Sequence, residues 1–146
     1  MSPNVKKSSH INNHESINAA TLEEIRELTV SPAGAEQFGK LIGLFLKELD
    51  SGVASLQEAA AEQNSERLGE IAHGLKGACG SMGASYLVSL CIALEEASAK
   101  AHFEQVGVQV KEMKSEIVIV REILEREIAD QSDLRRPPHA AAMRQD

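Results

Sequence analysis

The sequence has 146 residues, a formal net charge of −7 and 42% hydrophobic residues, which is typical of a single globular domain. Aromatic residues make up only 3% of the chain, tryptophan is absent, and alanine, leucine, glutamate and lysine abound, so we expect an all-α protein. The acidic charge argues against non-specific binding of nucleic acid, and no apolar run reaches the roughly 18 residues needed to cross a membrane.

Residues 1–20 are polar and show little periodicity, so we interpret them as a flexible N-terminal tail. Lys6 and Lys7 are not followed by an apolar segment, which argues against a secretory signal. A cytoplasmic location is the resulting expectation.

The first predicted helix begins at a capping box, with Thr21 as the N-cap and Glu24 at the third helical position, and it ends near Thr29. The Ser-Pro-Ala-Gly segment at 31–34 is predicted to interrupt the helical pattern. A long helix follows over about 34–62, because apolar residues recur every three or four positions. This apolar stripe consists of Phe38, Leu41, Ile42, Phe45, Leu49, Val53, Leu56 and Ala60.

Three more helices are predicted after a turn at Asn64, which suits an N-cap. The third ends at Met82 and Gly83, because glycine favours a helix C-terminus. The fourth spans about 84–99, with an inner face of Leu87, Leu90, Cys91, Leu94 and Ala97. The last spans about 103–130, with a stripe of Val106, Val110, Met113, Ile117, Val120 and Leu124. From Gln131 the period is lost, and 131–146 is predicted to be a disordered tail.

Four amphipathic helices with short connections favour an up-down antiparallel four-helix bundle, here over 21–130 with a short extra N-terminal helix. Cys79 and Cys91 occupy apolar helix positions, so we interpret them as small buried residues in preference to a disulfide or a reactive thiol.

The third helix carries His73 among glycines. On a helical wheel, six apolar residues lie within about 60° of the pole opposite His73, so the imidazole is predicted to point away from the core. These are Leu68, Ile71, Leu75, Ala78, Cys79 and Met82. Gly69 and Gly77 lie one turn before and after it, and Gly80 lies one turn further. Each interior glycine costs a helix about 0.8–1 kcal/mol relative to alanine. We therefore interpret the glycines as keeping the imidazole accessible.

An exposed imidazole is a candidate nucleophile, because histidine is substantially neutral at cellular pH and can attack an activated phosphoryl group. Lys76 lies three residues on, on the same helix face, where a cation can screen phosphoryl charge. The alternative is an ordinary surface histidine beside a solvated lysine, and the surrounding glycines argue against it.

The segment His73-x-Leu75-Lys76-Gly77, followed by Gly83-Ala84, resembles the H-x-L-K-G-x5-G-A signature of histidine-containing phosphotransfer (HPt) domains. The Leu-Cys-Ile-Ala-Leu-Glu stretch at 90–95 is similar to the L-C-x-x-L-E stretch of the family's next helix. The resemblance covers about 21–130. The sequence departs from the pattern at Gly74, where relatives often carry serine or threonine, and at Gly80, an additional glycine.

The resemblance implies a four-helix bundle that carries a phosphoryl group on one imidazole nitrogen and exchanges it with an aspartate. His73 matches the phosphorylated histidine, Lys76 the lysine that assists the phosphoryl group, and Gly77 the glycine that lets the partner approach. Glu95 matches a position whose carboxylate can hydrogen-bond the other imidazole nitrogen. An exposed helix carboxylate is an equal alternative for Glu95.

The resemblance also implies the partners: the receiver domain of a response regulator and a hybrid sensor histidine kinase. It implies no cofactor or metal in this chain, since the receiver supplies Mg²⁺. Docking is expected around Gly69, Glu70, Gly77 and Gly80, and monomer is the expected state. No ATP-binding pattern of a kinase is evident, so we expect a phosphoryl carrier, either freestanding or part of a larger hybrid kinase.

Two other functions deserve comparison. Glu70-x-x-His73 matches one element of a carboxylate-bridged di-iron bundle, but such a site needs a second copy and inward-pointing ligands. A non-catalytic bundle that binds and inhibits a signalling partner is the stronger alternative. The presence of both His73 and Lys76 argues against it, because a docking module needs neither.

Overall fold

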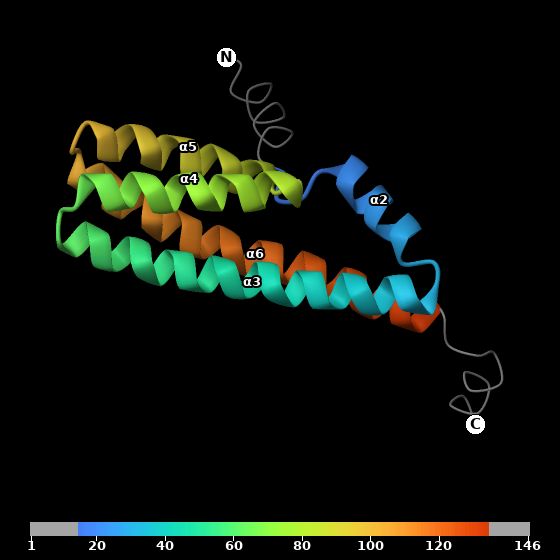
Figure 1. The fold of residues 1–146 in the computed structure, drawn as a ribbon. Helices are drawn as coiled ribbons and strands as arrows, with labels where there is room; N and C mark the ends of the chain where they lie inside the picture. Colours follow the sequence, from blue (N-terminus) through green and yellow to red (C-terminus); the bar gives the residue numbers. More distant parts are fainter. Residues whose placement is uncertain (1–14, 135–146) are drawn as a thin grey trace, which may run out of the picture.

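The computed structural model describes residues 15–134, which form five α-helices (Figure 1). These are α2 (Ala19–Leu28), α3 (Pro32–Ala61), α4 (Ser65–Ser81), α5 (Ser85–Ala99) and α6 (Phe103–Leu134). Helices α3 to α6 each pack on the next, and α6 returns to α3, so that they close a ring. Neighbours in this ring run in opposite directions (Figure 1). The predicted all-α antiparallel bundle with a short extra helix is confirmed.

The helix starts follow from side-chain caps. Asn18, and not Thr21, caps α2, because its side chain accepts a hydrogen bond from the Thr21 backbone N–H; the helix begins three residues earlier than predicted. Ser31 caps α3 and Pro32 occupies its first turn, so the segment predicted to interrupt the helical pattern instead starts the long helix. Asn64 caps α4 as predicted.

The end of α4 is also as predicted. Gly83 follows the helix with φ +70°, the left-handed conformation that favours glycine, and its backbone N–H donates to the Gly80 carbonyl. This sharp reversal sets α5 directly against α4. The pair forms one wall of the bundle (Figure 1).

The core lies inside the ring. Every inner-face residue predicted for α5 and α6 is buried, and so are Cys79 and Cys91, both of which are free thiols. The predicted burial is wrong for one member of the α3 stripe, because Leu41 is 59% exposed. It lines an open groove between α2, α3 and the C-terminal end of α4, so no helix covers it there.

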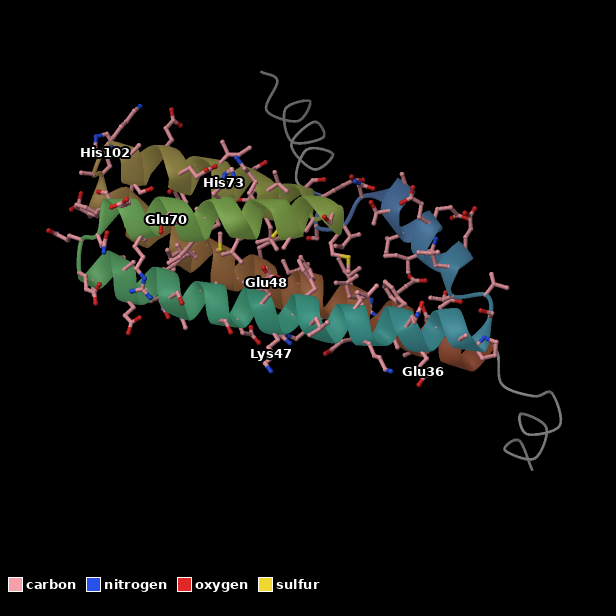
Figure 2. The ribbon with its side chains drawn as sticks, in the orientation of Figure 1. Glu36, Lys47, Glu48, Glu70, His73 and His102 are labelled. Carbon is pink, nitrogen blue, oxygen red and sulfur yellow. The ribbon has the colours of Figure 1, made fainter. Side chains whose placement is uncertain are left out.

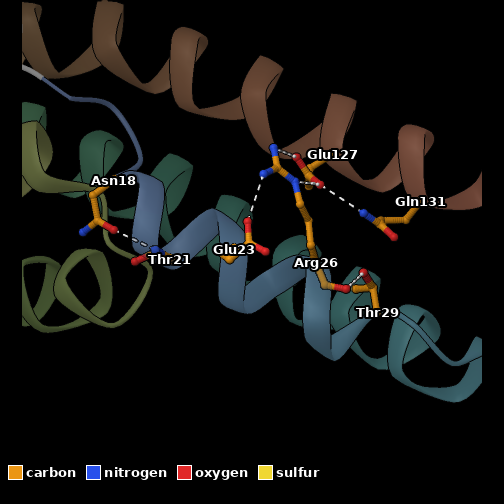
Figure 3. A network of polar contacts seen from close by, with 7 residues as sticks. All are labelled: Asn18, Thr21, Glu23, Arg26, Thr29, Glu127 and Gln131. Atoms are coloured by element: carbon orange, nitrogen blue, oxygen red, sulfur yellow. Dashed lines mark hydrogen bonds and ion pairs between the residues drawn. The ribbon is translucent and has the colours of Figure 1, made fainter.

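Helix α2 is held to α6 by a polar network (Figure 3). The Arg26 guanidinium binds the largely buried Glu127 carboxylate at 3.1 Å, and Gln131 donates to the same carboxylate at 3.2 Å. The hydrogen bond to Glu127 raises the pKa of Arg26 above its usual value. Helix α6 therefore continues to Leu134, past the predicted end near 130, with Gln131 buried. The rest of the predicted C-terminal tail, 135–146, lies outside the described residues.

The predicted N-terminal tail also differs from the structure. Ile17 is buried, the Asn18 N–H donates to the Gly83 carbonyl, and the Ser16 hydroxyl donates to Glu116 at 2.6 Å. Residues 15–20 thus belong to the packed structure, where they are hydrogen-bonded to the α4–α5 turn. The remaining residues of that tail, 1–14, lie outside the described part of the chain. Across residues 15–134, no helix combines the length and apolar character that a membrane span requires.

Candidate functional site

His73 lies midway along α4 with its side chain 71% exposed (Figure 2). The opposite side of the helix, with Leu68, Leu75 and Cys79, is buried, which confirms that the imidazole points away from the core. Ala72 is fully buried, whereas Ile71 is only partly buried. The buried side of α4 therefore includes Ala72, so the helix is rotated about its axis relative to the wheel prediction. This rotation brings His73 within reach of α5.

Glu95 on α5 binds both functional side chains of α4. Its Oε2 atom lies 3.0 Å from His73 Nδ1, and its Oε1 atom accepts a hydrogen bond from Lys76 Nζ at 2.8 Å. The hydrogen bond from Lys76 holds the pKa of Glu95 below its usual value, and the contact with His73 adds to that effect. An ionised carboxylate only accepts hydrogen bonds, so in the neutral imidazole Nδ1 carries the proton and Nε2 keeps its lone pair.

The glycines of this surface are not required by packing within the chain. A Cβ atom added to Gly74, Gly77 or Gly80 would have no neighbour within 4 Å. At Gly69 the added atom would lie 3.8 Å from Ser98 Oγ, an ordinary contact. Packing among the described residues therefore does not account for the bare α4 surface around His73.

An open groove adjoins the imidazole between the first half of α4 and the end of α5. Its lining residues are Ser65, Glu66, Gly69, Glu70, His73, Glu95, Ser98 and Ala99. Of the predicted docking residues, Gly69 and Glu70 lie in this groove, whereas Gly77 and Gly80 lie beyond His73 toward the helix end. Ser98 was not predicted, because its position on the buried side of α5 carries no signal of a site.

The di-iron alternative finds no support in the geometry. Among residues 15–134, no three His, Cys, Asp or Glu side chains come together as metal ligands would. Glu70 and His73 instead lie on the solvent side of α4 (Figure 2).

The chain is similar to known phosphotransfer proteins. The family model described as "Hpt domain" matches residues 40–135. The phosphorelay protein LuxU of Vibrio harveyi is 29% identical over 100 residues, which cover 68% of this chain and 87% of LuxU. The crystal structure of histidine-containing phosphotransfer protein B (HptB) from Pseudomonas aeruginosa PAO1 has the same fold, with a TM-score of 0.69 and 23% identity over 79% of this chain and 96% of HptB. Because the family model spans most of the length of this chain, the chain belongs to the Hpt domain family, the histidine-containing phosphotransfer proteins.

Proposed function

We propose that His73 is the phosphoryl-carrying residue and that it exchanges the group with the aspartate of a response-regulator receiver domain. A hybrid sensor histidine kinase stands upstream in this proposal, and the chain itself acts as a carrier. The observation that carries it is the 3.0 Å contact of His73 Nδ1 with Glu95 on an otherwise bare helix face. Hpt proteins act within phosphorelays together with receiver domains and kinases, and the relative LuxU is named a phosphorelay protein.

The geometry suits transfer through Nε2. With the proton on Nδ1, the Nε2 lone pair attacks the phosphorus of an aspartyl phosphate. A P–N bond forms while the P–O bond to the aspartate breaks, and the aspartate leaves as a carboxylate. The ring gains positive charge in this step, which the Glu95 carboxylate at Nδ1 stabilises. The same contacts serve the reverse transfer.

Lys76 supplies positive charge beside the imidazole. Its ammonium group is tethered by Glu95 and remains 32% exposed, so it can reach phosphoryl oxygens without leaving the site. In this proposal the receiver supplies the Mg²⁺. Catalysis then consists of positioning and charge stabilisation.

A docking-only module is the competing function. It would need the bare surface but not a carboxylate that joins His73 to Lys76. No contact among the described residues favours that alternative.

The test is phosphoryl transfer from a panel of phosphorylated receiver domains. Wild type is expected to gain an acid-labile, alkali-stable label, and His73→Gln none, while His102→Gln, an exposed histidine elsewhere, labels normally. Glu95→Gln is expected to slow transfer by about 10- to 100-fold, the range seen when the partner that orients a metal-bound histidine is removed. Label on His73→Gln would contradict the assignment, and binding without label on wild type would favour the docking-only module.

A further inference from the structure

The groove beside His73 has a volume of about 670 Å³ and a floor of small residues. Gly69 on α4 faces Ser98 on α5, and a Cβ at Gly69 would stand 3.8 Å from the Ser98 hydroxyl oxygen. Any side chain longer than alanine at Gly69 would occupy the groove. Since the groove shares His73 and Glu95 with the site, a partner that reaches the imidazole also covers it.

Two carboxylates on the groove lack a countercharge. Glu66 and Glu70 are exposed, and neither belongs to an ion pair among the described residues. The neighbouring cation Arg67 is directed to α3, where it binds Glu58 at 3.3 Å and Glu62 at 3.8 Å. Lys76 is bound to Glu95 on the other side of the imidazole. The groove therefore carries uncompensated negative charge.

This charge lies where an aspartyl phosphate must approach. Two free carboxylates beside a phosphoryl group and an acidic phosphorylation pocket oppose docking, unless the partner brings positive charge to the same place. Resting on the function proposed above, we propose that the groove is a specificity site that accepts a lysine or arginine side chain of the partner receiver domain.

The shape fits a long cationic side chain. Its aliphatic stem would lie on Gly69, Ser98 and Ala99, and its charged end would reach Glu66 and Glu70. Gly69 then has a role distinct from that of Gly77, because it leaves room for a side chain to enter and not only for a surface to approach. Receivers that present an acidic or apolar residue at this position would be rejected.

The first test removes the charge. The probe is the phosphorylated receiver that transfers fastest to wild type, and the variants are Glu66→Gln/Glu70→Gln and, as a control with the same charge change, Glu122→Gln/Glu125→Gln on α6. The groove variant is expected to slow association by about tenfold at low ionic strength and less at high salt, because salt screens the attraction. Transfer within the saturated complex is expected to remain unchanged.

The second test fills the groove. Gly69→Leu is expected to weaken binding of the same receiver by about tenfold or more, while labelling of His73 by the small donor phosphoramidate stays normal. Gly107→Leu is the matched control, because Gly107 is also helical and a Cβ there has no neighbour within 4 Å. Circular dichroism verifies that both variants are folded.

The outcomes separate the two proposals. If no receiver labels wild type, the proposed function is wrong. If receivers label wild type but the groove variant matches the α6 control at every salt concentration, the cation site is wrong and the phosphotransfer function stands. Faster association of the groove variant would also overturn the cation site, since the carboxylates would then oppose the partner.

Discussion

Glycine is present on two sides of α4, at the contact with α3 and on the solvent side, but for different reasons. On the α3 side, a Cβ added to Gly52 would lie 2.7 Å from a terminal methyl group of Leu75, so glycine is what lets the two helices meet. On the solvent side, a Cβ added to Gly77 would meet nothing within 4 Å. Packing in the folded chain explains one glycine, and the docking proposed above would explain the other.

This difference assigns each glycine a measurable consequence. Substitution at the packed position should change the free energy of unfolding and leave phosphoryl transfer intact in the folded fraction. Substitution at the bare position should impair transfer, and through helix propensity it should leave the protein at least as stable as wild type. The comparison is broken if the bare substitution lowers the free energy of unfolding or the packed one impairs transfer in the folded fraction.

The largest expected effect is on transfer, from Gly77→Gln. A long side chain one turn from His73 holds the receiver away, and a displacement of about 1 Å can lower a transfer rate about 100-fold. We therefore expect transfer from a phosphorylated receiver to fall by about that factor, while phosphoramidate still labels His73. Gly107→Gln on α6 is the control. A folded Gly77→Gln protein with a normal transfer rate would remove Gly77 from the docking surface.

The next effect is on stability, from Gly52→Ala. The new methyl group overlaps the side chain of Leu75, which is only 3% exposed and has little room to move. Overpacking of this kind costs about 1–3 kcal/mol, which exceeds the gain in helix propensity of about 0.8–1 kcal/mol. Urea unfolding should show a lower midpoint for Gly52→Ala and a higher one for Gly43→Ala, an open position in the same helix. Equal midpoints would mean that α3 and α4 adjust freely at this contact.

Much of the bundle and the outward direction of His73 could be predicted because both are carried by local periodicity. The His73–Glu95 pairing came from the family resemblance, and the structure supplies its geometry. The contact between Gly52 and Leu75 could not be predicted, because it depends on how closely two helices approach. Glycine at position 52 and glycine at position 77 look alike in a sequence.

The ends of the bundle show the same limit. Asn18 and Thr21 are both good N-cap residues, and the backbone hydrogen bond from Asn18 to Gly83 favours the earlier one. That bond joins residues far apart in the chain, and Ile17, which anchors the segment, is a lone apolar residue without a period. Gln131 likewise lies in α6 beyond the predicted end, where its side chain donates a hydrogen bond to Glu127. The same Glu127 carboxylate binds Arg26 of α2. Contacts of this kind are tertiary and leave no local pattern.

The smallest expected effect, from Gly74→Ala, tests whether every exposed glycine of α4 belongs to the docking surface. Gly74 is mid-helix and open, so alanine should stabilise the protein by about 0.8–1 kcal/mol, seen as a higher urea midpoint. On the helical wheel the position lies about 100° from His73, so we expect transfer within about twofold of wild type. A large loss of transfer would extend the partner's footprint toward α3. An unchanged rate would confine the footprint to the surface between Gly77 and the α4–α5 groove. On that surface a glycine lowers helix stability, and docking of the partner would be the reason for its presence.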